Sequence, residues 1–110
     1  MKLNKDDISG KIVKDNETYT VIDNAFLNDL VVSKTILHPG KATTGHNHEG
    51  QEEVYHFIHG SGQIGIGPEK FEISEGDIVL IPDGLYHRVW NSSKIEDLVF
   101  VCVFNGKRSH

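Results

Sequence analysis

The chain carries Gly40-Lys-Ala-Thr-Thr-Gly-His46-Asn-His48-Glu-Gly-Gln-Glu-Glu53-Val-Tyr-His-Phe-Ile-His-Gly60 and, fifteen residues further on, Gly76-Asp-Ile-Val-Leu-Ile-Pro82-Asp-Gly84-Leu-Tyr-His87-Arg-Val-Trp-Asn91. Both blocks place histidines among glycines and prolines, and the first also holds carboxylates. Imidazole and carboxylate groups together are the usual protein ligands of divalent transition metals. If the two blocks meet in space, they close one metal site inside one small domain.

Around these blocks, short strand-like segments alternate with turn residues. β-branched and aromatic residues gather in runs that Pro, Gly, Asn or Asp terminate, which is typical of strands. The pattern predicts about eight strands, at residues 18–23, 30–37, 53–58, 63–66, 71–73, 78–81, 87–90 and 98–104. Short strands at this spacing indicate an all-β sandwich or barrel. Only residues 4–12 and 23–29 could hold a turn of helix.

The candidate ligands follow the alternation of side chains along a strand. Successive strand residues point to opposite faces, so His46 and His48 project the same way in an extended segment. Glu53 opens the next strand and shares its face with Tyr55. Together with His87 of the second block, these side chains can converge on one ion inside a barrel.

Three imidazoles and one carboxylate form a mixed nitrogen and oxygen ligand set. Such a set suits manganese, iron(II), nickel, cobalt, zinc or copper, and the sequence does not choose among them. Four protein ligands on an octahedral ion leave two positions for water or substrate. The pattern therefore predicts one divalent transition metal ion in a site that is open to small molecules.

The two blocks resemble the two motifs of the cupin superfamily. The first motif reads G-x5-H-x-H-x4-E-x6-G, and its positions are filled by Gly40, His46, His48, Glu53 and Gly60. The second motif reads G-x5-P-x-G-x2-H-x3-N, and its positions are filled by Gly76, Pro82, Gly84, His87 and Asn91. The short spacing between them resembles that of small single-domain microbial cupins. The motifs cover roughly half of the chain, and the flanking strand pattern fits the same barrel.

The resemblance implies an antiparallel jelly-roll β-barrel with the metal inside. It implies one cupin domain over residues 1–110, in which about residues 1–15 form an N-terminal extension or pair with a partner. It also implies His46, His48, Glu53 and His87 as the metal ligands. Glu52 competes for the carboxylate role, but its spacing to Gly60 and its strand parity favour Glu53. Small members of the family commonly dimerise, and the apolar run 98–104 or the N-terminal segment could serve in a homodimer.

Several other residues can be assigned from their parity. Tyr55 should lie close enough to the metal to donate a hydrogen bond to a bound oxygen, which makes it the catalytic candidate. His56 should face away from the metal, and His59 should lie at the rim. A second set reads as core: Phe57, Ile64, Ile66, Phe71, Ile73, Val79 and Ile81. The only cysteine, Cys102, reads as a buried, inert thiol.

Composition limits the function classes. The chain has 110 residues and a formal net charge of −5, and it lacks the basic stripe that nucleic-acid binding requires. No segment is long and apolar enough to span a bilayer, and the N-terminus does not read as a signal peptide. A single cysteine permits no intrachain disulfide, so we expect a cytoplasmic protein.

These features predict a metal-dependent enzyme acting on a small polar or enol-type metabolite, with dioxygenase-like chemistry slightly favoured. One alternative is a non-enzymatic module that binds or senses a small ligand. Another is a sugar-phosphate isomerase, which needs a cationic clamp for phosphate. The cations available for that clamp are Lys34, Lys41 and Arg88.

Overall fold

The computed structural model describes residues 1–47 and 49–106, and strands are the regular secondary structure of this part of the chain. Nine strands are described there: β1 (Lys11–Asp15), β2 (Tyr19–Asn24), β3 (Leu30–Leu37), β4 (Glu53–His59), β5 (Ser61–Ile66), β6 (Glu69–Ser74), β7 (Ile78–Ile81), β8 (His87–Asn91) and β9 (Leu98–Asn105). The predicted all-β class is confirmed. Strands β2 to β9 coincide with the eight predicted segments to within two residues at either end.

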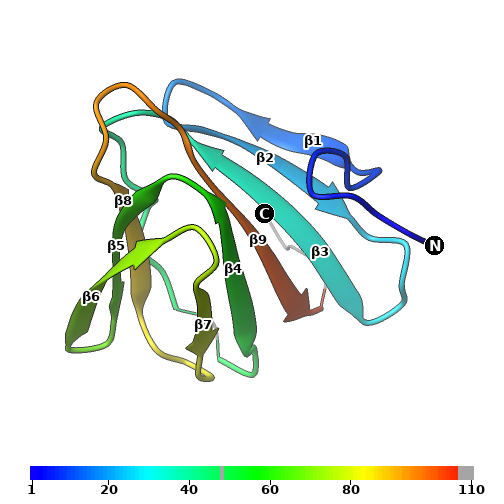
Figure 1. Cartoon of the computed structure of the whole chain (residues 1–110). Coiled ribbons are helices and arrows are strands. Elements are labelled where there is room, and N and C mark those ends of the chain that lie inside the picture. The colour runs from blue at the N-terminus through cyan, green and yellow to red at the C-terminus, as the bar shows by residue number, and fades with distance from the viewer. Residues whose placement is uncertain (48, 107–110) are drawn as a thin grey trace.

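The strands form two antiparallel sheets that face one another as a jelly roll (Figure 1). The larger sheet has six strands in the order β1-β2-β3-β9-β4-β7, and the smaller has three in the order β6-β5-β8. Because β9 lies between β3 and β4, both of its edges are already hydrogen-bonded within the chain. Residues 98–104 therefore cannot join a homodimer by pairing edge to edge with a strand of a second subunit.

The N-terminal part differs from its prediction. Neither residues 4–12 nor residues 23–29 form a turn of helix; Asn4 and Asp7 make an isolated bridge, and β1 begins at Lys11. Strand β1 pairs with β2 at the edge of the larger sheet, and it brings the described strands to nine, one more than predicted. In the parts of the chain that can be described, no helix is long and apolar enough to cross a membrane.

The core fills the space between the sheets. Strand β4 alternates buried and exposed residues, which confirms that Glu53, Tyr55 and Phe57 share the inward face. Ile64, Ile66, Ile73, Val79 and Ile81 are buried as predicted. Phe71 is 39% exposed, and its assignment to the core is wrong because β6 is the outer strand of the small sheet and leaves this ring open to solvent at one side.

The segment after β3 brings the first sequence block to the second. It runs along the free edge of β8, with bridges from Ala42 to Trp90 and from His46 to His87. The amide of His46 donates to the carbonyl of His87 at 3.2 Å, and the reverse bond measures 3.0 Å. Two residues distant in sequence thus become direct neighbours on one face.

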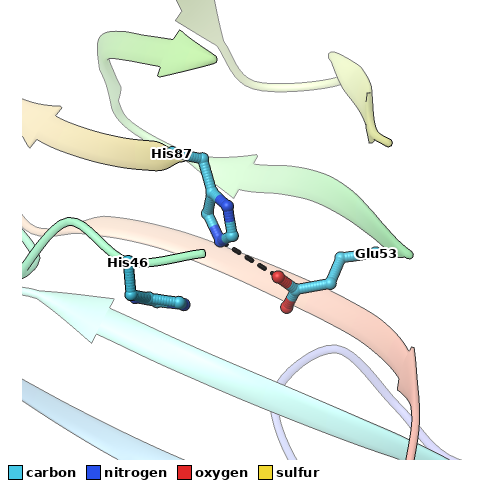
Figure 2. A group of neighbouring side chains, drawn as sticks. All are labelled: His46, Glu53 and His87. Atoms are coloured by element: carbon cyan, nitrogen blue, oxygen red, sulfur yellow. Dashed lines mark ion pairs between the residues drawn. The ribbon is translucent and has the colours of Figure 1, made fainter. Parts of the chain in front are cut away.

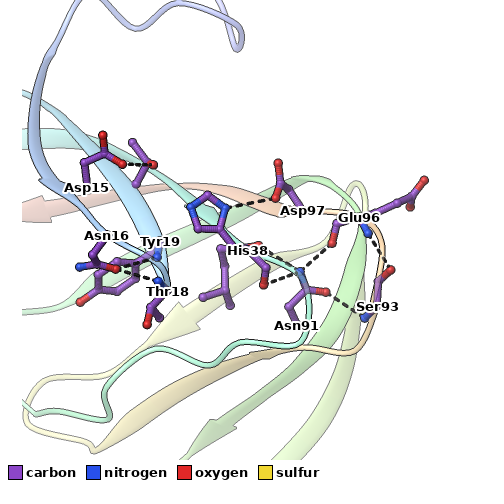
Figure 3. Close-up of polar contacts among 11 residues, drawn as sticks. Asp15, Asn16, Thr18, Tyr19, His38, Asn91, Ser93, Glu96 and Asp97 are labelled. Atoms are coloured by element: carbon purple, nitrogen blue, oxygen red, sulfur yellow. Dashed lines mark hydrogen bonds and ion pairs between the residues drawn. The ribbon is translucent and has the colours of Figure 1, made fainter.

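Two motif residues shape the ends of these segments. Gly84 has φ of 75° in the turn before β8, a conformation that glycine adopts without strain. The Asn91 side chain ends β8 inside a polar network (Figure 3). Its Nδ2 donates to the carbonyls of Leu37 at 3.0 Å and Glu96 at 2.8 Å, and its Oδ1 accepts from the amide of Ser93 at 2.9 Å. Asn91 therefore ties the end of β3 to the loop before β9.

Candidate metal centre

Three side chains from separate segments converge inside the barrel (Figure 2). His46 comes from the segment along β8, Glu53 from the first position of β4, and His87 from the first position of β8. One nitrogen or oxygen atom of each lies within 4.8 Å of those of the others. His48, the fourth predicted ligand, lies outside the described residues. The structure thus brings together the three predicted ligands that it describes.

Backbone carbonyls orient both imidazoles. Nδ1 of His46 lies 3.1 Å from the carbonyl oxygen of Thr44, and Nδ1 of His87 lies 3.1 Å from that of Leu85. A carbonyl only accepts, so each Nδ1 carries the proton and donates it. In the neutral imidazoles, Nε2 then presents its lone pair inward. This arrangement is common for metal-bound histidine, because the bond at the far nitrogen fixes the tautomer and the ring.

The contact between His87 and Glu53 indicates whether these residues can hold a cation. Nε2 of His87 is buried and lies 3.0 Å from Oε2 of Glu53, yet it has no aligned hydrogen-bond partner among the described residues. A nitrogen lone pair facing a carboxylate oxygen at this distance is unfavourable unless a proton or cation lies between them. The donor atoms therefore fit a divalent ion, which satisfies both.

The same contact raises the pKa of His87 above its ordinary value of 6.5. Burial alone would lower this pKa, but the interaction with the Glu53 carboxylate and the bond to the Leu85 carbonyl outweigh it. Without metal, Glu53 therefore favours the protonated imidazole of His87, whose second proton lies on Nε2. A metal must displace that proton before it can bind.

A cavity of about 320 Å³ opens beside these ligands. It is lined by Lys14, Tyr19, Val21, Thr35, Thr43, Thr44, His46, Glu53, Tyr55, Phe100 and Cys102. Its volume is in the range of small-molecule sites. Phe57, Ile64, Val79 and Val89 pack in the core and do not line this cavity.

Tyr55 lines the cavity, and neighbouring rings fix its position. Its ring stacks on Phe100 with centroids 5.1 Å apart and meets the His87 ring edge to face at 5.9 Å. Glu52 is exposed and lies outside β4, so it does not approach His46 and His87. His56 is exposed, as its parity predicted, and His59 is exposed at the end of β4, next to the turn at Gly60.

Sequence reasoning missed the cationic side of the cavity. Lys14 lies on β1, for which no strand was predicted, and Thr35, Thr43 and Thr44 carried no motif. Alternation within residues 30–37 was the one available signal, because it places Thr35 on the same face as Ser33 and Leu37, which are buried. Cys102 is buried as predicted, but it also lines the cavity.

Proteins similar to this chain in sequence include two that are uncharacterized. An uncharacterized protein of Methanocaldococcus jannaschii is 29% identical over 73 residues, which cover 66% of this chain and 58% of that protein. One from Streptomyces coelicolor is 34% identical over 59 residues, 54% of each chain. This chain thus spans little more than half the length of these relatives.

Solved structures agree on the fold. KdgF from Halomonas sp. has a TM-score of 0.77 at 19% identity, with 89% of each chain covered. A predicted oxalate decarboxylase from Thermotoga maritima has a TM-score of 0.74 at 22% identity, with 96% of this chain and 98% of that chain covered. At such identities the likeness extends to the fold alone.

The model of the cupin domain family matches residues 33–104. The matched region begins within β3 and ends within β9, so it contains the strands and the segment that carry His46, Glu53 and His87. Its match covers well over half of the chain and both sequence motifs. The protein therefore belongs to the cupin superfamily.

Proposed function

We propose that this cupin is a metal-dependent enzyme that acts on a small, oxygen-rich metabolite. The observation that carries the proposal is the pair of inward Nε2 atoms beside the Glu53 carboxylate, at the wall of a cavity of about 320 Å³. Cupins commonly bind a transition metal, and these donor atoms suit one. A closed structural site would need no adjoining space for a small molecule.

The side chains have separate tasks in this proposal. His46, Glu53 and His87 hold the ion, with His48 as the expected fourth ligand. The ion supplies Lewis acidity and, when it is redox-active, reactivity toward dioxygen. Tyr55 donates a hydrogen bond from the cavity wall to a substrate oxygen, and its stacking on Phe100 keeps its hydroxyl group in one place.

Oxidation by dioxygen is the reaction class that we favour. The sugar-phosphate isomerase alternative has less support, since Lys34, Lys41 and Arg88 do not line the cavity. Lys34 donates to the carbonyl of Lys5 at 2.7 Å, and Arg88 donates to that of Thr43 at 2.8 Å. Neither cation is therefore available to clamp a phosphate group inside the barrel.

Oxygen uptake tests the proposal. The protein is stripped with a chelator, reloaded with iron(II), manganese or nickel, and given a panel of small enols, diketones and phenolic acids. We expect substrate-dependent uptake by the wild type and by Glu52→Gln, whose altered carboxylate is exposed, and none by Glu53→Gln. Binding of panel compounds without uptake or product, with every metal, would instead favour a non-enzymatic ligand-binding module.

We also propose that the protein is a homodimer. The outer face of the larger sheet carries exposed apolar side chains on β4 and β7, among them Val54, Ile78 and Leu80. An exposed patch of this kind commonly marks an association surface.

A further inference from the structure

Lys14 contributes a cation to the wall of the metal-side cavity. Register places it in a row across the inner face of the larger sheet. Lys14 pairs with Val21, Val21 with Thr35, and Thr35 with Phe100. All four side chains line the cavity. The ammonium therefore shares one chamber with His46 and Glu53.

A bulge in β1 produces this orientation. Ile12 pairs with Ile22, but Lys14 pairs with Val21, so the register shifts between Ile12 and Lys14. Bulges of this kind occur often beside active sites, where they redirect a side chain. Here the bulge leaves Ile12 63% exposed, whereas Lys14 is partly buried beside the inward-facing Val21.

The ammonium of Lys14 makes no ion pair with any described residue. Its Nζ lies over the ring of Tyr19, 5.8 Å from the ring centroid. Among the described residues that line the cavity, Glu53 is the one acid, and its carboxylate is directed at His87. A partly buried cation without a carboxylate partner is well placed to bind an anion that enters from solution.

We propose that Lys14 is a specificity-determining residue that binds a carboxylate group of the substrate. The inference rests on the proposed function, because the same molecule must present another oxygen group to the metal ligands. The protein carries a net charge of −5, so a local cation is needed to favour an anionic ligand in this chamber. Together with the metal, Lys14 selects small molecules that carry a negative charge at the end remote from the ion.

The cavity favours a carboxylate over a phosphate. Phosphate recognition commonly uses the planar fork of arginine or several converging donors. This wall offers one ammonium, with threonine and tyrosine hydroxyl groups around it. A single charge-assisted hydrogen bond suits one carboxylate group, and a volume of about 320 Å³ suits a small acid.

Matched probes can isolate this contact. Malonate, succinate and glutarate differ in length, and each has a monoamide that keeps one carboxylate for the metal but replaces the other. Their dissociation constants are measured by calorimetry on zinc-loaded protein, because zinc supports no redox turnover. The variants are Lys14→Met, Lys14→Arg and Lys11→Met. Lys11 is an exposed lysine of the same strand that does not line the cavity.

We expect at least one diacid to bind the wild type about tenfold more tightly than its monoamide, which is the usual worth of one charged hydrogen bond. Lys11→Met should keep this preference, Lys14→Arg should keep part of it, and Lys14→Met should abolish it. Circular dichroism checks that each variant is folded. A wild type with no preference, or a preference that survives in Lys14→Met, would overturn the inference.

The two proposals fail in different ways. Failure of zinc to bind would overturn the metal site and this inference with it. Zinc binding without a preference that depends on Lys14 would overturn this inference alone. A preference that depends on Lys14 in a protein that turns over none of its bound ligands would support the carboxylate contact and overturn the enzymatic function.

Discussion

Two backbone carbonyls determine which nitrogen of each imidazole can reach a metal. Because Thr44 and Leu85 accept the Nδ1 protons of His46 and His87, both Nε2 atoms face Glu53. Because these carbonyls belong to the backbone, substituting the side chain of Thr44 or Leu85 leaves the acceptor of each ring in place. Among the described residues, no backbone group is seen to bond to the Glu53 carboxylate, which is therefore the group of the site best tested by mutation.

The two neighbouring glutamates give a matched pair for metal affinity. Glu53→Gln keeps the shape of the side chain but removes its charge beside two imidazoles, so the affinity should fall by about 100-fold or more, at or above the range for loss of an outer-shell partner. Glu52→Gln removes the same charge from an exposed position and should change the affinity less than about twofold. Zinc titration against a competing chelator measures both. Equal losses in both variants would show that the wrong carboxylate has been assigned.

The pKa of His87 predicts how the metal-free protein responds to pH. Burial lowers this pKa, but Glu53 and the Leu85 carbonyl raise it above 6.5 overall. A raised folded-state pKa means that the folded protein binds this proton more tightly than the unfolded chain does. The stabilisation is therefore complete below pH 6.5, the unfolded value, and is lost as the pH rises through the folded pKa. Urea unfolding of chelator-treated protein across this range measures it.

Two variants complete that measurement. Glu53→Gln removes the carboxylate that holds the proton, so the decline in unfolding free energy above pH 6.5 should largely disappear. Glu52→Gln should keep it. Metal should act in the opposite sense, stabilising the protein more as the pH rises, because it competes with the proton for Nε2. Metal-free stability that increases with pH through this range would contradict the assignment.

Tyr55 should matter for turnover and not for metal. Tyr55→Phe keeps the ring that stacks on Phe100 but removes the hydroxyl group that lines the cavity. Metal affinity should be unchanged, while kcat should fall by about 10²-fold or more, as is common when a positioned proton donor is lost. Steady-state kinetics on a substrate found in the oxygen-uptake panel would measure this. A kcat within about twofold of the wild type would remove Tyr55 from the catalytic role.

At the level of strands, alternation and turn residues predicted most of the fold. Strands β3 and β7 have the predicted bounds because Pro39-Gly40 and Pro82 stop them sharply. Strand β1 was missed because Lys11-Ile-Val-Lys-Asp15 interrupts its alternation with a bulge. The spacing of the motifs was enough to predict the ligands. The position of Lys14 in the cavity wall depends instead on the pairing of β1 with β2, which no local sequence pattern specifies.

The side chain of Asn91 joins β8 to the end of β3 and to the loop before β9. Its buried side chain satisfies carbonyls at the end of β3 and in the loop before β9. Asn91→Ala leaves these buried groups without a partner, so the free energy of unfolding should fall by about 2 kcal/mol or more. Asn105→Ala, at an exposed strand end, should cost less than about 0.5 kcal/mol. Equal unfolding free energies of Asn91→Ala and Asn105→Ala in urea titrations would contradict a structural role for the Asn91 network.

The inner and outer surfaces of the two sheets have different roles. The inner surfaces enclose the core, the candidate ligands and the cavity. On the outer surface of the larger sheet, the N-terminal segment approaches β3, where Lys34 donates to the carbonyl of Lys5. Farther across the sheet, Val54 pairs with Leu80 and His56 with Ile78, and β9 continues the surface with Val101 and Val103. This part of the surface is the proposed dimer interface.

A charge placed in that surface should separate the dimer. Leu80 is 69% exposed at the centre of β7, so a lysine there is well solvated in the monomer and leaves the fold intact. In a dimer, the same lysine would be buried against apolar side chains without a partner, which should weaken association by more than about 100-fold. Light scattering should therefore find twice 12.3 kDa for the wild type and 12.3 kDa for Leu80→Lys. Ile95→Lys is the control, because Ile95 is 87% exposed on a loop outside this surface, and it should stay dimeric. A wild type that remains monomeric at tens of micromolar, or a dimeric Leu80→Lys, would show that this surface does not join two copies.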